Sequence, residues 1–393
     1  MTLTPEEMAV QKVAPLTADF RTMVRERLRA RAERAGLDGL LLLAPGNVGY
    51  ASGWKFSIHE RPMGLWLPVG AEPTLFVPHL ELENAMDVPG VTVRTYEEFP
   101  GVVPPVLWMI GETRAKRLGI DTLDASLLAS AQDLAQIDLT DHCLPERSIK
   151  HPEELALVRA AAGFADLVLQ RFLAVAGDMI GQGGTELDLE ADCTGHARAV
   201  MAAMHNAAFA GTKMGITSSV HSGPRAALPH GAVLHRVPQK GEPIIVGIGA
   251  SLGGYHAESA ATFVYGDLTG DQRQVMAAMQ AANDATRDAL ARGLTCTEVN
   301  DAALAPIRAA GFGAAIRHRI GHGMGVEGHE APWLSIGDDT PTAPGMVFSC
   351  EPGIYRPAHD GWRCIETLIV GQAQVETPSR FQSNHPFDAR VIV

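Results

Sequence analysis

The chain has 393 residues, of which 46% are hydrophobic and 20% are charged, so it is neither a disordered chain nor a fibrous repeat. Its length predicts two domains, each with a core of its own. Thirty-two Lys and Arg against 45 Asp and Glu leave a net charge of −13. Because no basic run offsets this acidic excess locally, the composition argues against nucleic acid as a partner.

The cysteine pattern and the N-terminal composition favour a reducing, cytoplasmic setting. The five cysteines show no C-x-x-C pair and no regular spacing, which argues against a disulfide framework or a structural zinc site. Acidic residues interrupt the first 20 residues, where a signal peptide would need an apolar region. No apolar run approaches the roughly 18 residues of a membrane span. We therefore expect a cytoplasmic protein with no membrane partner.

The first part of the chain is predicted to form an α/β domain over 1–150. Apolar residues at helical spacing predict a helix at 20–35, and the run G-L-L-L-L-A predicts a buried strand at 39–44. Pro45 and Gly46 are expected to close that strand with a turn. Further predicted strands of a mixed sheet lie at 64–68, 74–78, 91–96 and 117–120. This half contains no cluster of catalytic residue types.

A polar stretch over 137–152 predicts a domain boundary near residue 150. Pro152 and the two glutamates after it are typical of a helix start, and apolar residues recur at helical spacing from 155 to 175. We expect the second domain to span 151–393. Its other predicted helices are 185–204, 272–292 and 297–310, and its predicted strands are 244–250, 255–265, 346–350 and 366–370.

Two glycine-rich segments of the second half contain histidines. In S-G-P-R-A-A-L-P-H-G, His230 is either a solvated loop residue or a proton carrier, because an unperturbed imidazole titrates near neutrality. In G-H-G-M-G-V-E-G-H-E, four glycines remove bulk from around His322 and His329, which allows backbone or ligand to approach closely. The second pattern favours a functional site.

Three strand-like segments carry charged residues. Glu351 ends the apolar run of V-F-S-C-E-P-G-I-Y, where a partly buried carboxylate must be paired, hydrogen-bonded or bound to something. Glu258 interrupts the otherwise apolar strand G-G-Y-H-A-E-S-A-A-T-F. Arg363 and Glu366 share the strand G-W-R-C-I-E-T-L-I-V, which is compatible with a structural Arg–Glu pair and with a carboxylate-binding site.

Taken together, these segments resemble the pita-bread fold family, which contains methionine aminopeptidase, prolidase, aminopeptidase P and creatinase. The resemblance rests on the ordered motifs S-G…L-P-H-G, G-H-G-x-G-x-E-x-H-E, E-P-G-I-Y and G-x-R, and it covers the whole chain. It implies a creatinase-type N-terminal α/β domain followed by a C-terminal pita-bread (α+β) catalytic domain. It also implies a homodimeric hydrolase that acts on C–N bonds of a small molecule or dipeptide.

The chain departs from the family at its metal ligands. The family's metallopeptidases hold two divalent ions with two Asp, one His and two Glu. Alignment with V-D-I-G-A puts Gly247 at the first Asp, and alignment with G-Y-H-S-D puts Glu258 at the second. His322 and Glu351 match the next two ligands, but Ile365 stands at the last Glu.

Glu366 follows directly after this position. Adjacent strand residues face opposite sides, so we do not expect Glu366 to replace the missing ligand. Ala260 and Ala261 stand where creatinase's substrate-binding strand would have a polar residue and an Arg. With two bridging carboxylates absent, a dinuclear centre is not expected.

These departures lead to the main hypothesis of a creatinase-like hydrolase of C–N bonds that needs no metal or other cofactor. The residues expected to catalyse the reaction are His230, His322, Glu351 and Glu258. His329 and Arg363 are expected to bind a substrate carboxylate.

Two alternatives remain open at this point. The first is a prolidase-like Xaa-Pro dipeptidase with one Mn, Zn or Co ion on Glu258, His322 and Glu351, because three protein ligands plus water form a known catalytic arrangement. The second is a non-catalytic binding protein with a pita-bread domain.

Overall fold

The computed structural model describes residues 12–54, 60–98, 101–210 and 212–393. The chain divides into two compact units. The smaller unit comprises residues 15–147, and the larger one comprises residues 148–393 together with 12–14.

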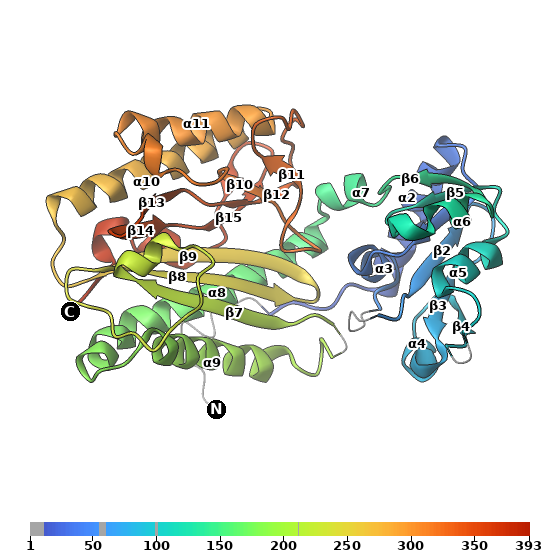
Figure 1. Ribbon diagram of the computed structural model, residues 1–393, viewed down its shortest axis with the longest axis horizontal. Coiled ribbons are helices and arrows are strands. Elements are labelled where there is room, and N and C mark those ends of the chain that lie inside the picture. Colours follow the sequence, from blue (N-terminus) through green and yellow to red (C-terminus); the bar gives the residue numbers. More distant parts are fainter. Residues whose placement is uncertain (1–11, 55–59, 99–100, 211) are drawn as a thin grey trace. The chain divides into compact units, whose positions relative to one another are not determined.

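The described part of the smaller unit forms a six-stranded mixed sheet in the order β4-β3-β2-β1-β5-β6 (Figure 1). The central pairs β1–β2 and β2–β3 are antiparallel, whereas β1–β5, β3–β4 and β5–β6 are parallel. The strands are β1 (Gly39–Leu42), β2 (Gly64–Pro68), β3 (Thr74–Pro78), β4 (Thr92–Tyr96), β5 (Arg117–Ile120) and β6 (Gln136–Leu139). The helices are α2 (Ala18–Arg34), α3 (Pro45–Ser52), α4 (Leu82–Ala85), α5 (Pro105–Thr113), α6 (Leu128–Gln132) and α7 (Leu144–Ser148).

Helix α3 begins where the sequence predicts only a turn. Pro45 occupies the first helical position, where its fixed φ suits a helix and its missing N–H costs nothing. Gly53 ends the helix in the left-handed conformation, with φ of 79°. The Pro–Gly pair after β1 therefore starts a helix instead of closing a turn.

The larger unit contains two sheets and a β-hairpin among its described residues. The first sheet has the order β17-β9-β8-β7, with β7 (Gly215–Ser222), β8 (Pro243–Leu252), β9 (Tyr255–Tyr265) and β17 (Val391–Ile392). The second sheet has the order β11-β10-β12-β15-β16, with β10 (Gly321–Gly323), β11 (Glu330–Leu334), β12 (Val347–Cys350), β15 (Glu366–Val370) and β16 (Val375–Glu376). The hairpin pairs β13 (Gly353–Arg356) with β14 (Asp360–Arg363).

Helices cover the outer faces of these two sheets. Figure 1 shows α8 (Pro152–Gly181) and α9 (Glu186–His205) along the first sheet, and α10 (Gly270–Ala291) and α11 (Cys296–Ala309) along the second. Helix α12 (Arg380–Asn384) also packs on α8. Helix α8 is long and apolar enough to cross a membrane, but 61% of its most apolar window is buried inside the protein. The described contacts of α8 are those of a core helix.

Three of these helices start at capping boxes formed by a Thr. In each, the Thr before the helix accepts a bond from a backbone N–H three residues later, and the acidic or amide side chain at that position accepts one from the Thr N–H. The pairs are Thr185 with Asp188, Thr269 with Gln272, and Thr295 with Glu298. These local signals explain why the helix starts follow the sequence prediction closely.

A backbone bridge connects the two sheets. Gly247 on β8 pairs with Ala260 on β9, and Ala260 forms an antiparallel bridge to Ile365, just before β15. The Ala260 and Ile365 N–H groups each donate to the other residue's carbonyl at 3.1 Å. None of these three residues has a polar side chain.

Candidate active site

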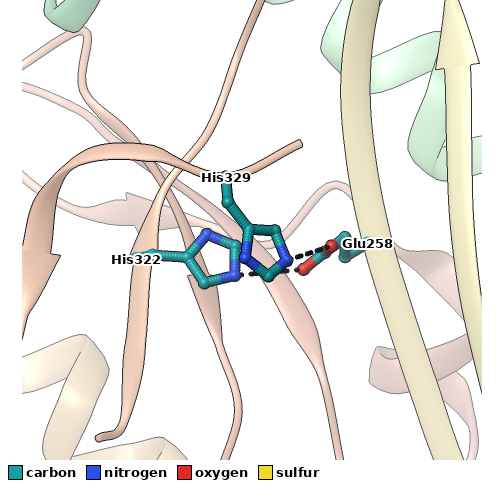
Figure 2. A group of neighbouring side chains, drawn as sticks. All are labelled: Glu258, His322 and His329. Atoms are coloured by element: carbon teal, nitrogen blue, oxygen red, sulfur yellow. Dashed lines mark ion pairs between the residues drawn. The ribbon is translucent and has the colours of Figure 1, made fainter. Parts of the chain in front are cut away.

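Three charged or titratable side chains from separate elements converge between the sheets (Figure 2). Glu258 comes from β9, His322 from β10, and His329 from the residue before β11. Glu258 Oε2 lies 3.5 Å from His322 Nε2, and Glu258 Oε1 lies 3.4 Å from His329 Nε2. The two imidazole rings stack with their centroids 3.8 Å apart. One possible ligand atom from each residue lies within 4.8 Å of the others.

Glu351 adds a second carboxylate to this group. It follows β12, and its Oε1 lies 2.7 Å from His322 Nε2. The Glu351 backbone N–H donates to the Ile320 carbonyl at 2.6 Å, which fixes the residue beside β10. His322 is thus flanked by carboxylates from both sheets.

Glycines on both sides of His322 make this convergence possible. A Cβ on Gly321 would collide with the Ser349 carbonyl, and a Cβ on Gly323 would lie 2.8 Å from the Glu330 carbonyl. Only glycine therefore lets β10 lie this close to both β11 and β12. The register shift between His322 and Gly323 accompanies this packing.

The two nitrogens of His322 have different surroundings. Its Nδ1 lies 3.0 Å from the Gly323 carbonyl, and since a carbonyl only accepts, Nδ1 must hold a hydrogen. The buried Nε2 faces Glu258 and Glu351 without a well-aligned hydrogen bond to a protein atom. In a neutral ring, Nε2 would direct a lone pair at two carboxylates. Either a proton or a metal cation must therefore occupy this position.

The pKa values agree with that arrangement. Burial alone would lower the pKa of His322, but Glu258 and Glu351 raise it to about 10. Burial would raise the pKa of Glu258, but the nearby imidazoles of His322 and His329 hold it well below its usual value. The pKa of Glu351 is also lowered, because the close approach of His322 outweighs burial. The two carboxylates are ionised and are suited to binding a cation.

The remaining predicted residues line the same cavity, which has a volume of about 850 Å³. His230 lies on an exposed turn after the short helix η3 (Gly223–Ala227). Arg363 is only 7% exposed and lies at the end of β14. Together with His322, His329 and Glu351, these two side chains form part of the cavity wall. Glu258 contacts this group through the two histidines.

The guanidinium of Arg363 fills the space beside Gly247. A Cβ on Gly247 would lie 2.5 Å from one terminal nitrogen of Arg363. The Arg363 backbone is held by Thr262, whose Oγ1 accepts from the Arg363 N–H at 2.9 Å and donates to its carbonyl at 2.8 Å. The position aligned with a bridging Asp thus has no side chain, and a cationic group occupies the adjoining space.

Glu366 points away from this site. It accepts hydrogen bonds from Asn283 and Arg287 on α10, as the alternation of strand residues predicted. The alternative of a structural Arg363–Glu366 pair is wrong, because Glu366 pairs with Arg287 instead. Ile365 is 6% exposed and presents no ligand atom.

A buried carboxylate that the motifs did not indicate anchors the loop with His230. Glu186 on α9 is fully buried and accepts bonds from the Ser222 N–H at 2.9 Å and the Leu234 N–H at 3.3 Å. Arg225 pairs with Glu186 and also donates to the Ala232 carbonyl. The Glu186 network thus holds the loop on both sides of His230. The T-E-L-D sequence at the start of α9 is the signal that could have indicated it.

Other cavity residues were missed by sequence reasoning. They are Arg317, His318, Arg319 and Ser335, of which the first three lie shortly before β10. The R-H-R sequence next to G-H-G was the available signal. His318 also contacts the Tyr355 hydroxyl through its Nε2 at 3.1 Å.

Comparisons with known proteins identify the family. Residues 156–376 match metallopeptidase family M24, and residues 25–141 match the creatinase/prolidase N-terminal domain. The chain belongs to metallopeptidase family M24. A probable dipeptidase, PepE, of Mycobacterium bovis is 32% identical over 345 residues, covering 86% of this chain and 88% of the relative.

Further relatives extend the comparison. A Xaa-Pro dipeptidase of Pyrococcus furiosus is 27% identical over 88% of this chain and 94% of its own length. The crystal structure of dipeptidase PepE from Mycobacterium ulcerans is similar with a TM-score of 0.83 and 27% identity, covering 96% of this chain and 99% of that one.

These findings confirm the predicted family resemblance, the creatinase-type and pita-bread domains, and a hydrolase that acts on C–N bonds. They favour the prolidase-like alternative over the creatinase-like hypothesis, because the relatives are named dipeptidases. The expectation that no cofactor is needed is wrong. The chain belongs to a metallopeptidase family, and Glu258, His322 and His329 form a cluster of possible metal ligands.

Proposed function

We propose that this protein is a prolidase-like dipeptidase that hydrolyses Xaa-Pro dipeptides with one divalent metal ion. Glu258, His322 and Glu351 would hold the ion, with His329 at the edge of the same cluster. The observation that carries the proposal is the buried Nε2 of His322, which faces two ionised carboxylates and has no aligned protein partner. A mixed nitrogen and oxygen set of this kind suits Zn, Mn or Co.

The donor set fits one ion but not two. A second ion would need the carboxylates that the resemblance implies at Gly247 and Ile365, and neither residue has a ligand atom. The guanidinium of Arg363 also lies where a side chain at 247 would extend, and its positive charge would repel a cation there. This supports a mononuclear form of the M24 site.

The chain's own residues would position the substrate and move the proton. A bound divalent ion activates water and polarises a carbonyl. Arg363 and His329 would bind the C-terminal carboxylate of the dipeptide, since a guanidinium matches a carboxylate with two parallel hydrogen bonds. His230, on its anchored loop, would donate a proton to the proline nitrogen as the C–N bond breaks. The water-derived hydroxyl then stays on the new carboxyl group.

The same proposal includes the domain boundary, the oligomeric state and the cellular location. We expect domains 1–150 and 151–393, a homodimer, and a cytoplasmic location. All five cysteines are buried and unpaired, which supports a reducing compartment. Size-exclusion chromatography with light scattering tests the dimer, and limited proteolysis near residue 150 tests the boundary.

The decisive test combines metal content with activity on Xaa-Pro dipeptides. We expect about one divalent ion per chain, loss of hydrolysis after chelation, and recovery when Mn, Zn or Co is added back. Glu258→Gln should lower both metal content and activity, whereas Glu83→Gln, an exposed charge of the smaller unit, should change neither. Full activity of the metal-free protein would overturn the proposal.

A further inference from the structure

The cavity concentrates positive charge in an acidic protein. Its lining includes three arginines, Arg317, Arg319 and Arg363, but only one acidic residue, Glu351. Glu351 is already paired with His322. The whole chain has the opposite balance, with a net charge of −13. A cavity lined by one sign of charge attracts ligands of the other sign, so this cavity favours anions.

The side chain of Arg319 is restricted by two contacts. Its guanidinium carbon lies 4.5 Å from the centroid of the Trp333 ring, and its Nε donates to the Gly321 carbonyl at 3.0 Å. The stacking and this bond restrict the side chain while its terminal nitrogens have no acidic partner among the described residues. A planar guanidinium fixed in this way is suited to binding a carboxylate.

Arg317 and Arg319 are both exposed and both line the cavity, and we call this pair the rim. Arg317 lies two residues before Arg319 and takes part in no ion pair within the described part of the chain. Arg363, in contrast, is buried beside Gly247. The cavity therefore has one buried guanidinium and two exposed ones, all without acidic partners among the described residues.

An ordinary Xaa-Pro dipeptide has a single carboxylate, and under the proposed function Arg363 binds it. The two rim arginines are then in excess of what such a substrate needs. We propose that Arg319, assisted by Arg317, recognises a second carboxylate on the substrate, so that the preferred Xaa is Glu or Asp. This inference rests on the proposed dipeptidase function and specifies its substrate class.

The test compares substrates that differ only in that charge. Glu-Pro and Gln-Pro have nearly the same shape, so the ratio of their kcat/KM values measures recognition of the carboxylate. We expect Glu-Pro to be preferred about fivefold, the effect of one guanidinium–carboxylate pair at an exposed site. Because solvent screens exposed charges, the preference should decrease as salt rises from 0.05 to roughly 0.5 M.

Variants assign the preference to the rim. R319Q, and more strongly R317Q/R319Q, should bring the Glu-Pro to Gln-Pro ratio close to one. R319K retains the positive charge but lacks the planar guanidinium with its parallel N–H donors, so it should keep part of the preference for Glu-Pro. The matched control is R308Q on α11, an exposed arginine outside the cavity lining, and the ratio should not change there. A ratio in R317Q/R319Q equal to that of the wild type would overturn the inference.

A binding measurement separates this inference from the function on which it rests. Calorimetric titration of the wild-type protein with Glu-Pro and Gln-Pro under chelating conditions reports affinity without turnover. Hydrolysis is assayed separately on the metal-loaded protein. Tighter binding of Glu-Pro, with no hydrolysis of either dipeptide by the metal-loaded protein, would support the rim assignment and refute the dipeptidase. Hydrolysis of both at equal rates, with equal affinities, would refute the rim assignment and leave the dipeptidase intact. Equal affinities without hydrolysis would refute both.

Discussion

A methyl group at residue 247 provides a sharp test of how Arg363 functions. In Gly247→Ala, the new Cβ would lie 2.5 Å from a terminal nitrogen of Arg363, whereas ordinary contacts begin at 3.4 Å. The guanidinium must therefore move by about 1 Å to restore van der Waals distance. The contact involves the far end of a flexible side chain, so we expect a stability loss of only about 1 kcal/mol.

Substrate recognition should suffer more than stability. If Arg363 holds the C-terminal carboxylate, its displacement weakens hydrogen bonds between charged groups, which contribute about 1.5–3 kcal/mol. This corresponds to a rise in KM of about tenfold to 150-fold. Metal content should not change, because Gly247 has no ligand atom.

Gly249→Ala is the matched control on the same strand and face. Its Cβ would meet only the Thr217 hydroxyl, at 3.3 Å, and would leave Arg363 untouched. Steady-state kinetics on a Xaa-Pro dipeptide and on its C-terminal amide complete the assay. The wild type and Gly249→Ala should discriminate strongly between acid and amide, whereas Gly247→Ala should not. A folded Gly247→Ala protein with wild-type KM and acid preference would refute the assigned role of Arg363.

Three further predictions concern residues of the site. His230→Ala should lower kcat by roughly 10² to 10⁴, the usual contribution of a positioned proton donor. The control is His235→Ala, which changes an exposed histidine of the same loop that does not line the cavity and should retain wild-type kcat; equal effects of the two variants would remove His230 from the mechanism. Glu186→Gln should cost about 1–3 kcal/mol in the free energy of unfolding, because buried donors lose an ionised acceptor, and should also lower kcat; an unchanged melting temperature and kcat would contradict the anchoring role. The pKa of His322 is raised to about 10 in the folded, metal-free protein. Its contribution to stability is therefore complete below its unfolded pKa of about 6.5 and is lost as pH rises towards 10. The free energies of unfolding of the metal-free wild type and of His322→Gln, measured by denaturant titration, should converge with rising pH, and a constant difference between them would refute the assignment.

Elements with strong local signals could be predicted from the sequence. The strand Tyr255–Tyr265 is largely apolar after Ser259, and its observed bounds equal the predicted ones. The helices after Thr185, Thr269 and Thr295 start at capping boxes that involve only residues three positions apart. Such signals do not depend on the rest of the fold, so the sequence alone is enough to predict these elements.

Elements stabilised by distant neighbours were missed. Strand β7, G-I-T-S-S-V-H-S, has no apolar run, and it is a strand because it pairs along its whole length with β8. The prediction of one strand shared by Arg363 and Glu366 is wrong, because Arg363 ends β14 of the hairpin and Glu366 begins β15 of a different sheet. The partner strand β13 is missing from the prediction, although Ile354 is fully buried. Burial by other segments supplies the stabilising free energy here, and a sequence alone does not show which segments those are.

The site shows the same division between local and distant information. Glycine spacing marked His322 and His329, because it reports a local need for close backbone approach. No such glycine pattern singles out Arg319, because the stacking that restrains it comes from Trp333, a residue distant in the sequence. The error on the cofactor arose because missing ligands were counted without knowing that Glu258, His322 and His329 would meet as one cluster.

The residues that depart from the family pattern make physical sense as one set. Gly247, Ala260 and Ile365 lie in one row across the two sheets, linked by backbone pairing. In the mononuclear site that we propose, neither end of this row supplies a ligand to a second cation. The guanidinium of Arg363 lies beside Gly247, and a Cβ at residue 247 would be 2.5 Å from one of its terminal nitrogens. The position of this guanidinium therefore depends on the absence of a side chain at residue 247, and its positive charge would disfavour a metal cation in the same place.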